Sequence, residues 1–261
     1  MIRYALLGLV QGLTEFLPVS SSGHLVLAQR WLGLDPPGVL LEAMLHWGTL
    51  AAVLVVFRRD IVALLLSLRG KGRVELRKDA GFLIAGTVPL VTVALLFREG
   101  IQSAFSSTMA IGVGLLVTAA VLCAGHFAAR GRNRHALIRF PDALGVGLAQ
   151  AAAVFPGISR SGLTISAGHV LGLTAAQAVR FAFLLSIPAL FGAGLLHLLD
   201  ALETPQVHDW LGLTIGASCA FASGWLSLRA ALALVMRGKL WVFAIYCLLL
   251  GSSVLAWSAL A

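Results

Sequence analysis

The sequence predicts an all-α polytopic membrane protein with six spanning helices and two re-entrant broken-helix hairpins, arranged as an inverted-topology repeat. The first observation behind this prediction is composition. The chain is 59% hydrophobic and 11% charged, with a mean hydropathy of +0.94, whereas a soluble domain carries about 25% charged residues. The second is that two apolar segments are broken near their middles by Pro, Gly and Ser. The length of 261 residues suits a single integral-membrane domain, 1–261.

Six apolar runs are long enough to cross about 30 Å of hydrocarbon as helices. Each run predicts one spanning helix. The predicted helices are 39–57, 80–97, 108–127, 177–199, 210–228 and 240–260.

Two further apolar regions, 2–34 and 141–172, are interrupted by the clusters Pro18 to Gly23 and Pro156 to Gly162. The helical stretches on either side of each break are only about half the length needed to span. Irregular backbone at bilayer depth is tolerated only where it faces protein or a water-filled cavity. Both regions are therefore predicted to be re-entrant hairpins.

The distribution of Lys and Arg predicts the orientation, because short basic loops stay in the cytoplasm. The linkers 58–78, 130–139 and 229–239 carry seven, four and three basic residues, and 98–107 and 200–209 are mainly acidic. When the chain is traced through these assignments, the first hairpin enters the membrane from outside and the second enters from the cytoplasm. Both termini are then expected outside.

An offset of 139 residues aligns the two broken segments, placing Gln11 on Gln150 and Ser21 on Arg160. Hairpins that enter from opposite faces and share a sequence pattern indicate an inverted repeat. We expect the first half over about 1–127, a basic linker over about 128–140 and the second half over about 141–261. Such repeats place their binding site between the halves near the membrane midplane.

The first loop combines a carboxylate with hydroxyls and an imidazole. Gln11 and Glu15 are four residues apart and share one helix face, and Ser20, Ser21, Ser22 and His24 follow the break. The hydroxyls could simply cap the next helix, but together with an intramembrane Glu they suit nucleophilic or acid/base chemistry. Glu15 with neighbouring oxygens would also suit Mg²⁺ or Ca²⁺.

The second loop centres on Arg160. Ser159, Ser161 and Gly162 surround it, and its guanidinium offers a planar fork to phosphate oxygens. Snorkelling to the membrane surface is the alternative, but an arginine bracketed by Ser and Gly at a helix break favours anion binding. The two loops together predict a site for a small anionic group, with phosphoryl transfer as a fitting reaction.

Other function classes are disfavoured. The net charge of +8 comes from short loops, without an aromatic and basic platform for nucleic acid. The three cysteines lie singly in apolar runs, without metal or redox spacing. The N-terminal run lacks a small-residue cleavage site and is interrupted by Gln11 and Glu15, so we expect it in the mature protein.

These residues strongly resemble the bacterial undecaprenyl-diphosphate phosphatase family, the type linked to bacitracin resistance. The family motif (E/Q)GxTEFLPVSSxGH corresponds to Gln11 to His24, PGxSRSG to Pro156 to Gly162, and RFxFLLxIP to Arg180 to Pro188. The resemblance implies hydrolysis of undecaprenyl diphosphate to undecaprenyl phosphate, which recycles the lipid carrier for peptidoglycan. It further implies a divalent cation, the cytoplasmic (inner) membrane and a site open to the periplasm.

The resemblance also implies roles for individual residues. Glu15 takes a metal and catalytic position, with Gln11 where many members have Glu, and Ser21 or His24 takes that of the nucleophile. Arg160 takes the phosphate-binding position. The remaining phosphate-contacting positions are Ser20, Ser22, Ser159, Ser161 and Gly162.

The expected partners are the bilayer and a polyprenyl diphosphate lipid, without nucleic acid, and a homodimer is compatible with them. A transporter or flippase of a similar anion is the rival interpretation, since inverted repeats with broken helices are a transporter architecture. The set of Glu15, Ser21, His24 and Arg160 favours the hydrolase, because it holds more proton-transfer chemistry than anion binding requires. A purely structural bundle would leave both polar loops unexplained.

Overall fold

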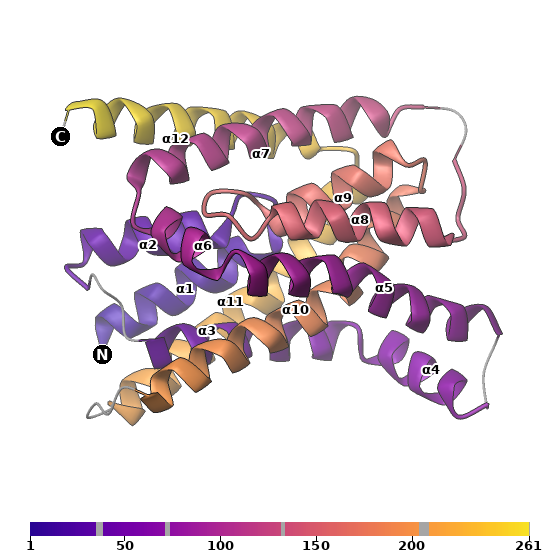
Figure 1. Cartoon of the computed structure of the whole chain (residues 1–261), viewed down its shortest axis with the longest axis horizontal. Coiled ribbons are helices and arrows are strands. Elements are labelled where there is room, and N and C mark those ends of the chain that lie inside the picture. Colours follow the sequence, from indigo (N-terminus) through magenta and orange to yellow (C-terminus); the bar gives the residue numbers. More distant parts are fainter. Residues whose placement is uncertain (35–38, 71–73, 132–133, 204–208, 261) are drawn as a thin grey trace.

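The computed structural model describes residues 1–34, 39–70, 74–131, 134–203 and 209–260, and these residues form helices (Figure 1). No strand occurs in those ranges, where the one β-bridge pairs His135 with Leu173. The helices are α1 (Ile2–Phe16), α2 (Ser21–Trp31), α3 (Val39–Val56), α4 (Arg58–Leu68), α5 (Val74–Leu96), α6 (Arg98–Phe105), α7 (Thr108–Ala128), α8 (Phe140–Ala152), α9 (Arg160–Val170), α10 (Ala175–Glu203), α11 (Trp210–Met236) and α12 (Leu240–Leu260).

The six predicted spanning helices are confirmed as α3, α5, α7, α10, α11 and α12, each long and apolar enough to cross a membrane. Three of them extend further than their apolar runs. The helix α5 starts at Val74, α10 reaches Glu203 and α11 reaches Met236. Backbone hydrogen bonding continues into the flanking polar residues, which an apolar run alone does not reveal.

Two segments predicted as linkers contain short helices. The linker 58–78 holds α4 and the connection 98–107 holds α6. Each buries an apolar side chain, Leu64 in α4 and Ile101 in α6. Their lengths are too short to span, which is why hydropathy alone did not distinguish them from loops. The basic residues Lys71, Arg73 and Arg132, used for the orientation, lie outside the described residues.

The two broken regions form antiparallel pairs of half-length helices, α1 with α2 and α8 with α9. The backbone leaves the helical conformation at Leu17 and again between Ala153 and Ser159. Gly157 has a φ of 81°, a left-handed conformation that favours glycine. The breaks thus occur where the Pro, Gly and Ser clusters predicted them, and the depth of the hairpins in the bilayer stays a prediction.

The two halves meet through reciprocal contacts. The helices α2 and α9 start and end at positions 139 apart, and α1 packs on α11 as α8 packs on α5. Gly23 lies against Gly157, and Gly162 lies against Pro18. The 139-residue offset relates Gly23 to Gly162 and Pro18 to Gly157. The two contacts therefore join equivalent pairs of positions in the two halves. A two-fold relation between repeats produces this pattern.

Both chain termini lie at one end of the bundle, while α4, the start of α5, the end of α7 and the start of α8 lie at the other (Figure 1). The predicted basic linkers connect elements at this second end. The structure therefore places the termini opposite the basic side, as the chain tracing from charge requires.

The second hairpin is held at this basic end by polar contacts. The Arg134 guanidinium donates to the carbonyl oxygens of His169 and Leu173, 2.9 and 3.0 Å away. At the start of α8, Asp142 accepts hydrogen bonds from the backbone and side chain of Arg139. Burial opposes ionisation of this carboxyl, but the hydrogen bonds from Arg139 prevail and lower the pKa of Asp142 below its ordinary value.

The helices α1 and α11 pack through small residues. Gly8 faces Gly216 and Cys219, and Gly12 faces Ala220 and Ser223. Glycine lets the two backbones approach closely, a common arrangement between membrane helices. This close packing fixes the helix that carries Glu15.

Replacing Gly12 by alanine is expected to destabilise the protein by about 1–3 kcal/mol, because the added methyl group would overlap Ser223 and the Ala220 carbonyl. Gly192→Ala in α10 is the matched control, since its methyl group meets nothing within 4 Å. Unfolding midpoints in detergent measure the difference. Equal midpoints for the two variants would contradict close packing at Gly12.

Candidate active site

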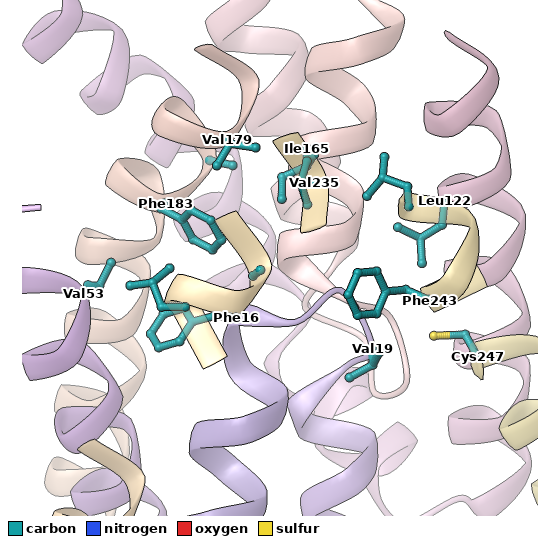
Figure 2. Close-up of a cluster of buried hydrophobic side chains, with 14 of the residues drawn as sticks. Phe16, Val19, Val53, Leu122, Ile165, Val179, Phe183, Val235, Phe243 and Cys247 are labelled. Atoms are coloured by element: carbon teal, nitrogen blue, oxygen red, sulfur yellow. The ribbon is translucent and has the colours of Figure 1, made fainter. Parts of the chain in front are cut away.

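Apolar side chains anchor the first loop on both sides of its break. Phe16 packs edge-on against Phe183, with ring centroids 5.9 Å apart. Val19 is buried beside Phe243 of α12, and Figure 2 shows Phe16 and Val19 within one hydrophobic cluster. The loop between them is therefore held from two directions, which fixes the polar residues that follow.

Ser20 shapes the start of α2. Its Oγ accepts a hydrogen bond from the Gly23 amide at 3.3 Å, as an N-cap. It is the one non-glycine residue in the described chain with a positive φ, 71°, a conformation that costs of order 1–3 kcal/mol. The resulting backbone places the Ser20 carbonyl oxygen 2.8 Å from Nδ1 of His24.

The second loop repeats the N-cap, although Ser159 has an ordinary φ of −79°. Ser159 Oγ accepts from the Gly162 amide at 3.1 Å, and the Ser159 and Ser161 hydroxyls are 3.3 Å apart. In the first loop the Ser20 and Ser22 hydroxyls are also 3.3 Å apart. Equivalent residues thus cap both helices, and the N-termini of α2 and α9 lie at the same junction between the halves.

Glu15 joins the two loops. Its Oε2 accepts hydrogen bonds from Ser21 Oγ at 2.5 Å and from Gln11 Nε2 at 3.0 Å. Its Oε1 accepts a hydrogen bond from Arg160 Nη2. The Ser161 hydroxyl also crosses between the loops and donates to the Leu17 carbonyl oxygen, 3.2 Å away. Glu15 therefore contacts a hydroxyl of its own half and a guanidinium of the other.

The electrostatics of this junction favour an anion. The Glu15 side chain is 3% exposed and is compensated by Arg160. Arg160 Nη1 is buried without a hydrogen-bond partner in the described part of the chain, so part of its donor fork stays available. Free amides at two helix N-termini add positive potential. A phosphate group would satisfy these donors.

His24 stands apart from the Glu15 cluster. Its printed hydrogen bonds link Nδ1 to the Ser20 carbonyl oxygen and Nε2 to the Tyr246 hydroxyl, 2.7 Å away. A carbonyl oxygen can only accept, so Nδ1 carries the proton. In the neutral imidazole Nε2 is then an acceptor. Nε2 of His24 is therefore the atom that can act as an acceptor or a base beside the serine loop.

The residues at Glu15 do not fit a cation held by the protein alone. Both carboxylate oxygens already accept hydrogen bonds, and the Gln11 amide contributes a donor rather than an oxygen ligand. Within the described residues no group of three His, Cys, Asp or Glu side chains could hold a metal. Mg²⁺ and Ca²⁺ need about six or more oxygens, so a cation here would draw its ligands mainly from another molecule.

Two supporting residues were not predicted. The Thr118 hydroxyl of α7 accepts from the Ser159 amide and donates to the Gly157 carbonyl oxygen, at 2.9 and 3.0 Å. Tyr246 of α12 contacts His24. Both are isolated polar residues in apolar spans, which is the only signal that the sequence offers for them.

Other polar residues lie in separate contacts. Arg180 donates to Asp60 and Asp79, joining α10 to α4 and α5. Near the opposite end, Glu42 accepts from Gln29 and lies 3.5 Å from His197. These groups connect helices and do not belong to the Glu15 cluster.

Comparison with known proteins identifies the family of the chain. A family model described as bacitracin resistance protein BacA matches residues 4–253. An undecaprenyl-diphosphatase of Korarchaeum cryptofilum is 41% identical over 261 residues, covering 96% of this chain and 97% of the relative. Undecaprenyl-diphosphatase 1 of Halalkalibacterium halodurans is 40% identical over 267 residues, covering 98% and 96%. The chain belongs to the bacitracin resistance protein BacA family.

Proposed function

We propose that this protein hydrolyses undecaprenyl diphosphate to undecaprenyl phosphate and inorganic phosphate, recycling the lipid carrier for peptidoglycan synthesis and conferring bacitracin resistance. The observation that carries the proposal is the shared carboxylate. Glu15 binds the Ser21 hydroxyl and the Arg160 guanidinium at once. A base, a hydroxyl and a phosphate-binding cation thus meet at one point, and relatives named undecaprenyl-diphosphatase support the substrate.

In the first step Ser21 is the nucleophile. Its hydroxyl lies within hydrogen-bonding reach of a carboxylate base, the arrangement that activates a serine. The Ser21 oxygen forms a bond to the terminal phosphorus while its proton passes to Glu15. The bond between that phosphorus and the bridging oxygen breaks, and undecaprenyl phosphate leaves with the bridging oxygen.

In the second step water hydrolyses the phosphoserine. The water oxygen bonds to phosphorus, the bond to the Ser21 oxygen breaks, and the serine recovers its proton from Glu15. His24 Nε2 takes the proton of the attacking water once the Tyr246 hydroxyl releases this nitrogen, and it then passes that proton to solvent. Phosphate then leaves.

Arg160 and the helix N-termini bind the transferring group. Phosphoryl transfer needs positioning and charge stabilisation more than covalent assistance. Donors for the phosphate oxygens are Nη1 of Arg160, which has no hydrogen-bond partner in the described residues, and the helix starts at Ser20 to Ser22 and Ser159 to Gly162. The polyprenyl tail stays among lipid-facing helices.

The site is proposed to open to the periplasm from the inner membrane. Support comes from the basic connections at the end of the bundle opposite both termini (Figure 1), since basic loops remain cytoplasmic. Both termini and the entry of the first hairpin then face the periplasm. A homodimer is compatible with this arrangement.

A divalent cation, Mg²⁺ or Ca²⁺, is proposed to enter with the diphosphate, since the residues at Glu15 offer few free oxygens. EDTA is expected to lower phosphate release from purified protein and a polyprenyl diphosphate by at least about tenfold, and added Mg²⁺ or Ca²⁺ should restore it. Calorimetry with the cation alone should show no stoichiometric binding to the substrate-free protein.

Stoichiometric cation binding in that measurement would contradict a cation that depends on substrate. An absence of phosphate release with any metal would contradict the hydrolase itself. Movement of the intact diphosphate lipid between leaflets, without hydrolysis, would instead favour the transporter interpretation.

A further inference from the structure

The Tyr246 hydroxyl occupies an unusual position for a polar group. It lies within α12, a 21-residue apolar helix whose neighbouring side chains Ile245, Leu248 and Leu249 are exposed. Polar groups in such helices seek a partner on another helix. The partner of Tyr246 is His24 of α2, 222 residues away in the sequence.

The contact between Tyr246 and His24 has two components. The rings are stacked, with centroids 5.6 Å apart and an interplanar angle of 10°. The hydroxyl oxygen lies 2.7 Å from Nε2. A phenylalanine would provide the stacking alone, so the hydroxyl adds a function that ring packing does not explain.

The two nitrogens of His24 are thereby assigned. The Ser20 carbonyl oxygen accepts from Nδ1, and the Tyr246 hydroxyl donates to Nε2. Both partners are uncharged, and neither stabilises an imidazolium ion as a carboxylate would. The Ser20 carbonyl selects the tautomer, and the Tyr246 hydroxyl, which can donate or accept, fixes the plane of the ring.

Other ionisable groups near this loop are engaged elsewhere. Glu15 of α1, which packs against α2, is bonded to Ser21 and Arg160. In α12, the Cys247 thiol faces the Pro18 carbonyl oxygen at 3.7 Å. Tyr246 is therefore the side chain that contacts Nε2.

We propose that Tyr246 is a positioning residue for His24: its hydroxyl bonds Nε2 and its ring stacks on the imidazole, which together hold the His24 ring in one place beside the serine loop. The inference rests on the proposed function for the use made of His24. It adds a residue from the last helix, in the second half of the chain, to a loop of the first half.

The test compares Tyr246→Phe with Tyr4→Phe, the other tyrosine of the chain. Tyr4 packs against Gly212 through its ring, so its change is a matched control. Protein labelled with ¹⁵N-histidine is measured by NMR without substrate, and His24→Ala identifies the His24 signals. In Tyr246→Phe we expect the Nε2 signal to move, because this nitrogen loses its hydrogen bond, whereas Tyr4→Phe should match the unaltered protein.

Steady-state kinetics supply the second measurement. Tyr246→Phe is expected to lower kcat by about 3–10-fold, the worth of roughly one hydrogen bond, with KM little changed. Tyr246→Leu, which also loses the ring, should lower kcat further. An unchanged Nε2 signal in Tyr246→Phe, or a moved Nε2 signal with unchanged kcat, would overturn the proposal. Inactivity of the unaltered protein would contradict the proposed function, while the Nε2 signal still decides the positioning of His24.

Discussion

Replacing Arg160 by alanine is expected to lower kcat/KM for phosphate release by about 10³-fold or more. Arginine clamps on transferring phosphoryl groups contribute effects of about this size. The change also leaves Glu15 buried without its cation, and an uncompensated buried charge costs about 3–5 kcal/mol of stability. Activity and unfolding midpoint are therefore both measured, on protein that elutes as a single species.

Arg160→Lys separates charge from geometry. Lysine keeps the positive charge and the pairing with Glu15, but it lacks the planar fork that leaves Nη1 available for phosphate. We expect near-normal stability with activity still reduced by at least about tenfold. Arg98→Ala, which removes an exposed pair with Asp200 outside the site, is the matched control. Full turnover by a folded Arg160→Ala protein would rule out the phosphate-binding role.

Replacing Ser21 by alanine is expected to reduce phosphate release by about 10³-fold or more, because removal of an activated nucleophile has effects of this order. Stability should change little, since Ser21 is partly exposed and Glu15 keeps its contacts with Gln11 and Arg160. Initial rates and trapping of a labelled phosphoenzyme measure the effect. Ser253→Ala in α12 is the control, as its hydroxyl bonds only within its own helix at Leu249.

Retention of activity by Ser21→Ala, within a few fold of the unaltered protein, would exclude serine attack. The nucleophile would then be His24 or water. A labelled phosphoenzyme that survives in Ser21→Ala but disappears in His24→Ala would identify the histidine.

Hydropathy and composition were sufficient to predict the spanning helices. Interruption by Pro, Gly and Ser was sufficient to predict the breaks, because these residues change local backbone preferences whatever surrounds them. The helices α4 and α6 escaped prediction because their apolar faces are short and acquire meaning only against the bundle. The positive φ of Ser20 was equally hidden, since serine rarely adopts it and the surrounding anchors impose it.

The candidate site also contains residues that the sequence predicted and residues that it did not. The motifs indicated that Glu15, Ser21 and Arg160 act together, and the structure brings them into contact. Tyr246 and Thr118 could not be predicted, because their roles arise from helices brought together over long sequence separations. The sequence also could not show whether Gln11 offers its oxygen or its amide to the neighbouring carboxylate, which depends on one side-chain rotation.

The bond between Glu15 and Arg160 makes each half of the chain incomplete. The first repeat holds a carboxylate without a cation, and the second holds Arg160 where Ser21 stands in the first and Val154 where Glu15 stands. The carboxylate and the cation thus stand in different halves. Once the repeats have diverged in this way, the change is hard to reverse, because no single substitution restores equivalence between the halves. Residues separated by 145 positions are therefore expected to evolve as one unit, with any tolerated change at position 15 accompanied by a change at position 160.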